Sequence, residues 1–298
     1  NLPGNLPLPG IPGMAAGLAG AEAPAAWRSG GAEAFVAAVG EPRPEHIQRS
    51  RSVLDELPLE LVSAAHDVYR ARCVVYALLL DRDHTKRREQ IELLARRCES
   101  GVLVELQHLL TPVQSLPDHL RLPMIDMLLP ALREMSMRQY QAFRADLDAL
   151  IDADREVSLF EFCIEQVMLR HLATSYGKPP RRKTLHKTLA PLKAECQALL
   201  SSLARFGHDN ADEARTAYAA GMAELFRDAP TLPYLDEDDA PVASIAKALD
   251  ALDRSTPYCK RALLSACATT AAADGVIAAV EAELLRAIAD AVDCPVPI

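Results

Sequence analysis

Apolar residues recur at three- and four-residue steps through most of the chain beyond His46, which is the pattern of amphipathic helices. It predicts helical structure over 59–80, with Val75–Leu80 buried on most sides. It also predicts helices over 136–151, 158–175, 242–253 and 257–272, and two helices within 189–227 that break near Gly207. No segment alternates as a strand does. We therefore expect an all-α fold made of repeated helical hairpins.

Short polar signals predict where several helices begin or end. Ser136-Met-Arg-Gln139 and Ser158-Leu-Phe-Glu161 both have the spacing of a capping box, in which two side chains bond to each other's backbone N–H groups. Leu116-Pro117 and Leu122-Pro123 interrupt the helical pattern in the middle of residues 46–176. Pro295 and Pro297 are expected to end the last helix.

One pattern occurs twice, at a constant offset of 120 residues. Asp154-Arg-Glu-Val157-Ser-Leu-Phe-Glu161 reappears as Asp274-Gly-Val-Ile277-Ala-Ala-Val-Glu281 inside a longer ungapped match. Each copy predicts a helix, a short acidic turn and a second helix, so the repeated unit is a helical hairpin. We call residues 152–161 the first acidic turn and residues 272–281 the second acidic turn.

A degenerate third copy lies upstream. Leu80-Asp81-Arg82-Asp83 corresponds to Ile151-Asp152-Ala153-Asp154, and Gln90 then falls at the position of Glu161. Lys86 replaces the valine that is expected to be buried. We call residues 80–90 the upstream turn.

Composition divides the chain into four parts. Residues 1–45 hold eight of the thirteen glycines and seven prolines, which predicts a flexible arm rather than a helix or a sheet. Residues 46–176 form a first helical domain, which contains the upstream turn and the first acidic turn. Residues 177–188 form a basic hinge without apolar periodicity, and residues 189–298 form a C-terminal helical domain.

The overall charge and composition exclude several classes of function. A formal charge of −9 argues against a general nucleic-acid binder, which would present an extended basic surface. Seven cysteines without a C-x-x-C pair are expected to act as small core hydrophobes in a reducing compartment. No run of about eighteen apolar residues is free of charge, so the isolated chain is expected to be soluble. The basic hinge is interpreted as a solvated linker, with weak contact to anionic lipid as the alternative.

The acidic turns are the candidate binding sites. Asp274, Gly275, Ile277 and Glu281 match positions 5, 6, 8 and 12 of an EF-hand loop, whose first half is missing. Because calcium takes six to eight oxygen ligands, we expect these carboxylates mainly to close the turns through backbone hydrogen bonds. A weak divalent-ion site, or one shared between turns, is the alternative, and so is an acidic surface that docks a partner. The candidate ligands are Asp274, Glu281, Asp152, Asp154 and Glu161.

No catalytic motif is visible in the sequence. The eight histidines include no H-E-x-x-H and no pair four residues apart, so local spacing builds no zinc-peptidase site. There is no G-x-S-x-G, no phosphate-binding glycine loop and no dinucleotide fingerprint. The sequence therefore assigns no catalytic or cofactor-binding residue.

Two blocks of sequence carry a resemblance to known families. Val75-Tyr-Ala-Leu-Leu-Leu-Asp-Arg-Asp83, Leu122-Pro-Met-Ile-Asp-Met-Leu-Leu-Pro-Ala-Leu-Arg133 and Leu159-Phe-Glu-Phe162 resemble the soluble C-terminal region of bacterial HtpX-like membrane zinc peptidases, of the CAAX prenyl endopeptidase type. The ending, from Ala273-Asp-Gly-Val-Ile277 to Cys294-Pro, resembles TerB-like (tellurite-resistance-type) helical modules.

The resemblance implies a non-catalytic accessory or regulatory region of a membrane-bound zinc-dependent peptidase, on the cytoplasmic side of the bacterial inner membrane. Zinc and the membrane segments would then belong to a peptidase domain upstream. The partner would be another protein or that peptidase domain. The alternative is a stand-alone TerB-like stress-response module that binds a divalent ion or a protein partner through its acidic turns.

Overall fold

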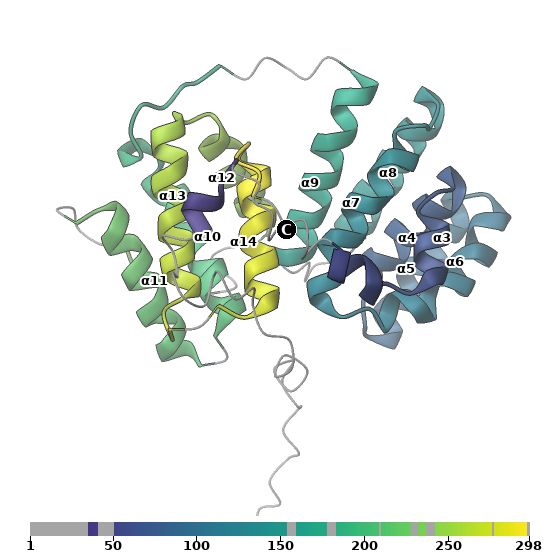
Figure 1. The fold of residues 1–298 in the computed structure, drawn as a ribbon, viewed down its shortest axis with the longest axis horizontal. Coiled ribbons are helices and arrows are strands. Elements are labelled where there is room, and N and C mark those ends of the chain that lie inside the picture. The colour runs from purple at the N-terminus through teal and green to yellow at the C-terminus, as the bar shows by residue number, and fades with distance from the viewer. Residues whose placement is uncertain are drawn as a thin grey trace, which may run out of the picture.

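The computed structural model describes residues 35–40, 51–153, 159–177, 183–208, 210–227, 232–236, 242–275 and 277–296. Within these ranges the chain is helical and contains no strand, and one isolated β-bridge joins His186 to Ser255. The predicted all-α fold class is confirmed (Figure 1). No helix among the described residues is long and apolar enough to cross a membrane.

The first group of helices packs around α4. Asp67 caps this helix by accepting a hydrogen bond from Arg70 N–H at 2.8 Å. Cys73 to Leu80 are all buried, which confirms the prediction for Val75–Leu80. Tyr76 packs against Phe143 with ring centroids 5.6 Å apart. The helices of this group are α3 (Leu59–Ala64), α4 (Val68–Leu79), α5 (His84–Arg97), α6 (Ser100–Gln114), η2 (Asp118–Leu120), α7 (Arg121–Leu132) and α8 (Met137–Ala153).

The second group packs around α10, which contacts α11, α12 and α13. Small residues let these helices approach closely. A Cβ atom placed on Gly221 of α11 would lie 2.1 Å from Thr270 Oγ1 and 3.0 Å from the Ala266 carbonyl oxygen of α13. The helices of this group are η3 (Ala190–Leu192), α10 (Lys193–Gly207), α11 (Ala211–Leu225), α12 (Val242–Asp253), α13 (Pro257–Ala271) and α14 (Ala279–Ala291).

The two groups meet through α9 (Leu159–Tyr176) and α14, which stand side by side at the centre of the molecule (Figure 1). On the other side of α9 lies α7 of the first group. The core is therefore continuous from one group to the other. Alanine and leucine supply much of it, in keeping with the low aromatic content.

The helix boundaries agree with most of the local signals. Ser136 and Gln139 form the predicted capping box: Ser136 N–H donates to Gln139 Oε1 at 2.8 Å, and Gln139 N–H donates to Ser136 Oγ at 3.3 Å. The chain breaks between α10 and α11 just after Gly207, as predicted. The starts of α8 and α13, and those of α9 and α14, are each 120 residues apart.

The predicted helical region 59–80 is confirmed and consists of two helices: α3 ends at Ala64, and Asp67 caps the start of α4. Two other signals turn out differently. Leu122-Pro123 does not interrupt the chain but lies in the first turn of α7, where a missing N–H breaks no helical hydrogen bond. The last helix ends at Ala291, ahead of the prolines. Asp293 there takes a φ of 61°, and Cys294 N–H donates to Ala289 O at 2.8 Å.

Candidate functional site

The second acidic turn, between α13 and α14, takes its shape from one glycine and one buried aliphatic residue. Gly275 has a φ of 88°, a conformation that a side chain would strain, and its N–H donates to Ala272 O at 2.9 Å. Ile277 is buried and holds the turn to the core, while Asp274 is exposed. Gly275 and Ile277 thus fix the shape of this turn.

Glu281 is the buried carboxylate of the second acidic turn, only 5% exposed. Its Oε2 accepts a hydrogen bond from Ala278 N–H at 2.7 Å, which is one half of a capping box; alanine at 278 has no oxygen for the other half. Its Oε1 faces the end of α10, where a Cβ atom on Gly207 would lie only 2.2 Å away. The carboxylate therefore fits between α14 and α10 because residue 207 is glycine.

Burial changes the acidity of Glu281. Desolvation raises its pKa from 4.5 to about 7; the hydrogen bond from Ala278 opposes this shift, and the charge of Asp274 adds to it. The Glu281 carboxyl gains or loses its proton near neutral pH.

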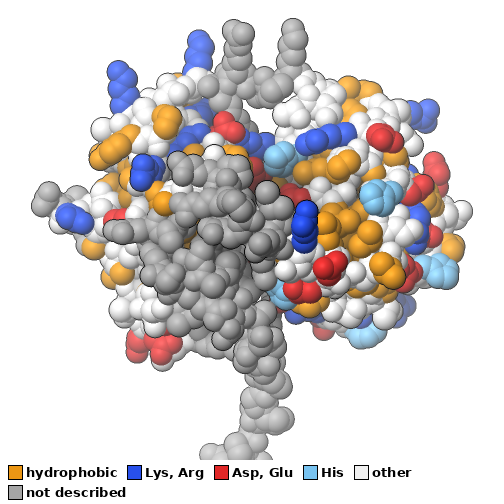
Figure 2. Space-filling model, viewed as in Figure 1, with side chains coloured by type: hydrophobic (Ala, Val, Ile, Leu, Met, Phe, Trp, Pro, Cys, Tyr) orange, Lys and Arg blue, Asp and Glu red, His pale blue; other side chains and the backbone are white. Residues whose placement is uncertain are grey.

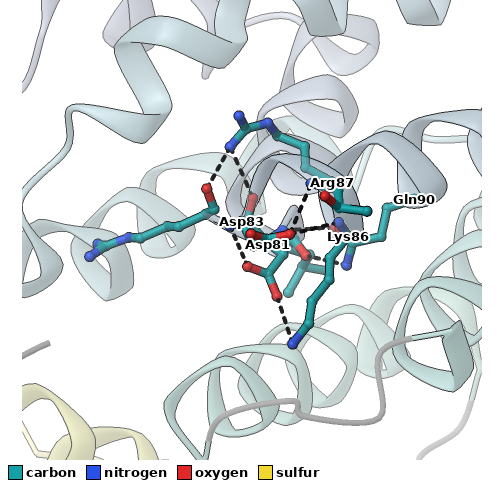
Figure 3. A network of polar contacts seen from close by, with 8 residues as sticks. Asp81, Asp83, Lys86, Arg87 and Gln90 are labelled. Carbon is teal, nitrogen blue, oxygen red and sulfur yellow. Dashed lines mark hydrogen bonds and ion pairs between the residues drawn. The ribbon is translucent and has the colours of Figure 1, made fainter. Parts of the chain in front are cut away.

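The upstream turn, between α4 and α5, is a closed network of polar contacts (Figure 3). Gln90 joins its two ends: Oε1 accepts from Asp81 N–H at 2.8 Å, and Nε2 donates to Leu79 O at 3.4 Å. Asp83 Oδ1 accepts from Thr85 N–H at 2.8 Å and from Lys86 N–H at 3.0 Å. These bonds lower the pKa of Asp83.

Cationic side chains of the protein occupy the middle of the upstream turn. Arg87 is buried, and its Nη1 donates to the carbonyl oxygens of Asp81 and Arg82 at 3.2 and 3.0 Å. Lys86 Nζ lies 3.8 Å from Asp81 Oδ2 (Figure 3). Loop carbonyls and an acidic side chain are the groups that a calcium loop offers to its ion. In this turn Arg87 donates to the loop carbonyls, and Lys86 lies beside the acidic side chain of Asp81.

The upstream turn also differs from the two acidic turns in backbone. The correspondence with α9 and α14 places the start of α5 at Arg88, whereas α5 begins at His84 with Asp83 as its N-cap. Two substitutions explain the earlier start. Lys86 replaces the aliphatic residue that holds the second acidic turn to the core, and Asp83 caps the helix directly.

The first acidic turn lies largely outside the described residues. The backbone of Asp152 belongs to the last turn of α8 and that of Glu161 to the first turn of α9, but their side chains and the whole of Asp154 are not described. Their predicted role as ligands stays a prediction. Among the residues that are described, no group of three or more His, Cys, Asp or Glu side chains is arranged to hold a metal ion.

A second polar cluster, which no pattern in the sequence predicts, joins the two groups of helices. Arg286 of α14 is 6% exposed; its Nη1 donates to Asp126 Oδ2 of α7 at 3.1 Å, and its Nη2 lies 3.0 Å from Glu283 Oε2. We call this cluster, with Arg170, His171 and Asp290, the charged junction.

Helix α9 completes the charged junction. Arg170 Nη1 donates to the carbonyl oxygen of Ala291 at 2.9 Å and also to that of Asp290, at the end of α14 where carbonyls lack helical partners. His171 Nε2 lies 2.9 Å from Asp290 Oδ2, and this hydrogen bond raises the pKa of His171. Arg170 and Asp290 are 120 residues apart, which is the offset of the predicted repeat.

The sequence contains a weak signal of the charged junction, which is a single charged residue within each of two apolar runs. Asp126 interrupts the apolar run Met124-Ile125-Asp-Met127-Leu128, and Arg286 interrupts Leu284-Leu285-Arg-Ala287-Ile288. A charge on an apolar helix face indicates a buried ion pair, because an unpaired buried charge is strongly destabilising. The partner of each charge, however, lies on a distant helix.

No protein-family model matches the chain, and searches of curated proteins and of solved structures likewise find no match.

Proposed function

We propose that this chain is a non-catalytic accessory region of a membrane-bound zinc-dependent peptidase, placed on the cytoplasmic side of the membrane. In this role it binds a protein partner or the peptidase domain itself. Zinc and catalysis belong to the peptidase domain, and the helical chain regulates which proteins reach it.

The observation that carries this proposal is a set of exposed apolar side chains on the first group of helices. Leu59 of α3 is 85% exposed, Val104 of α6 is 57% exposed, and Leu54 in the preceding helical turns is 47% exposed. Helices α3 and α6 adjoin, since Arg70 bonds to Glu105 of α6 at 2.7 Å and reaches Ser63 of α3 at 3.5 Å. Figure 2 shows hydrophobic side chains gathered on the half that contains these helices. Such gatherings are typical of protein-binding surfaces.

The charged junction supports a regulatory role. Because its ion pairs join α14 to α7 and α9, a protein bound to the first group is held in a fixed position relative to the second. Binding energy gained on one group can then favour one arrangement of the other. This property suits a region that couples partner binding to substrate access.

Two measurements test the proposal. In the source DNA, the frame upstream of Asn1 should encode transmembrane segments and H-E-x-x-H; a start codon directly upstream, with nothing else encoded, would remove the link to proteolysis. The peptidase domain so found should bind this chain, and Leu59→Asp with Val104→Asp should weaken binding about tenfold or more. Met137→Asp is the matched control, because Met137 is 49% exposed on α8. Equal loss in the control would contradict the assigned surface.

A second candidate is a TerB-like module that binds a divalent ion at the second acidic turn. The observation that favours it is the Glu281 carboxyl, which is buried beside Asp274 with its pKa raised to about 7. A bound cation would favour the ionised form. Calorimetric titration with calcium or zinc should then give micromolar affinity that Asp274→Asn abolishes.

A further inference from the structure

Two segments far apart in the sequence form one corner of the second group of helices. The N–H groups of Leu185 and His186 donate to Arg254 O at 2.8 and 3.2 Å, and Thr256 N–H donates to His186 O at 3.0 Å. Helix α13 begins at the next residue. We call residues 183–188, together with Tyr258 and Arg261, the basic corner. It lies at the upper left of Figure 1, where α13 begins.

The basic corner exposes two large apolar side chains. Tyr258 is 82% exposed and Leu185 is 58% exposed, while the large apolar residues nearby, such as Leu189 and Leu192, are buried. Neither exposed side chain contributes to the core. A tyrosine has an apolar ring and a polar hydroxyl, a combination enriched at the interface between membrane and water.

The same corner is locally positive in a chain of net charge −9. Lys183, Lys187 and Arg261 are exposed. The nearby acids are already paired: Asp250 Oδ2 accepts from Arg254 at 2.7 Å, and Asp253 Oδ1 accepts from Lys260 at 2.8 Å. In the sequence, 178–193 contains six lysines and arginines and no acid. Figure 2 shows Lys and Arg side chains next to hydrophobic ones in this part of the face.

We infer that the basic corner binds the surface of a membrane that contains anionic phospholipids. Lysine and arginine are attracted to the negative headgroups, and their long side chains keep the charge in the headgroup layer. Leu185 and Tyr258 then enter the boundary between headgroups and acyl chains, where exposed apolar surface is removed from water. The inference does not depend on the link to a peptidase, although it would place an accessory region against the membrane that anchors its parent enzyme.

The test is sedimentation of the full chain with vesicles of phosphatidylcholine alone and of phosphatidylcholine mixed with phosphatidylglycerol. We expect binding to the mixed vesicles only. Removing the cations (Lys183→Ser, Lys187→Ser, Arg261→Ser) should weaken it about tenfold or more, and Leu185→Ser with Tyr258→Ser should weaken it several-fold. The matched controls remove exposed cations elsewhere (Arg96→Ser, Arg138→Ser, Arg144→Ser) and an exposed apolar side chain elsewhere (Met137→Ser); neither should change binding.

Three outcomes would overturn the inference. The first is no binding to mixed vesicles by a chain whose helicity is intact. The second is equal loss in the control variants, which would indicate attraction by charge anywhere on the surface. The third is tight binding of poly-glutamate without binding of vesicles, which would assign the corner to an acidic protein. The upstream reading frame affects none of these outcomes, so failure of the proposed peptidase link and failure of membrane binding are distinguishable.

Discussion

Arg286 of α14 and Asp126 of α7 form an ion pair of 3.1 Å across 160 residues of sequence. The guanidinium is nearly buried and also pairs with Glu283, whose side chain is 13% exposed. This enclosed charge joins the two groups of helices. Its removal should therefore affect the whole fold rather than one helix.

We expect Arg286→Ala to lower the free energy of unfolding by about 3 kcal/mol, because it leaves Glu283 and Asp126 without their cation. This figure is at the low end for a buried pair, since 38% of the Asp126 side chain is exposed. Asp126→Asn should cost less. Urea unfolding of both single variants and the double variant gives the coupling energy. Additive effects would contradict direct pairing of the two residues.

The buried carboxyl of Glu281 makes stability depend on pH. Its pKa is about 7 in the folded protein against 4.5 ordinarily, so the folded state binds the proton more tightly. The contribution of this carboxyl to the free energy of unfolding is fully present below about pH 4.5. It is lost as the pH rises through about 7, and the loss is up to about 3 kcal/mol. His171, whose pKa is also raised, contributes in the same direction.

Glu281→Gln isolates the contribution of this carboxyl. The amide keeps an oxygen for Ala278 N–H but cannot ionise. The variant should match the unchanged protein near pH 4.5 and exceed its stability by up to about 3 kcal/mol at pH 8. Urea unfolding across this range is the measurement. A difference that does not grow with pH would show that Glu281 titrates normally.

Local chemistry explains which elements could be predicted from the sequence. Ser136 and Gln139 are three residues apart, and their capping box forms as expected because both partners belong to one turn. Similarly, Gly207 is followed directly by the break between α10 and α11. In the second acidic turn residue 278 is alanine, so the bond from Ala278 N–H to Glu281 has no reciprocal partner.

What the sequence did not predict depends on contacts between distant segments. Glu281 is buried because α10 presents a glycine to it, and no pattern within residues 272–281 indicates this. The acids of the upstream turn and Gln90 match the sequence of the first acidic turn. The start of α5, however, depends on Asp83, which caps the helix, and on Lys86, which is not buried in the core. Asp126 and Arg286 could be recognised as misplaced charges, but not as partners.

Gly221 should tolerate no side chain, because α11 and α13 touch there. We expect Gly221→Ala to cost about 1–3 kcal/mol, since its Cβ would meet Thr270 Oγ1 and the Ala266 carbonyl oxygen, and backbone cannot move aside locally. Gly101→Ala is the matched control: its Cβ would meet only the hydroxyl end of Tyr69, and alanine favours the helix. Thermal unfolding compares the two variants, and equal melting temperatures would contradict the close approach.

The role of the second acidic turn is decided by its response to divalent ions. If Asp274 and Glu281 serve to close the turn, Asp274→Ala with Glu281→Ala removes the acceptor of Ala278 N–H and leaves a space beside Gly207. At pH 6 we then expect a loss of about 1–2 kcal/mol. The loss should be equal in EDTA and in excess calcium, because no ion contributes to the folded state. Ligand binding would instead stabilise the unchanged protein in proportion to the logarithm of the ion concentration. The opposite result has two parts. In EDTA the double variant would unfold at the same midpoint as the unchanged protein, and calcium would raise the midpoint of the unchanged protein only. That result would show that these carboxylates bind an ion.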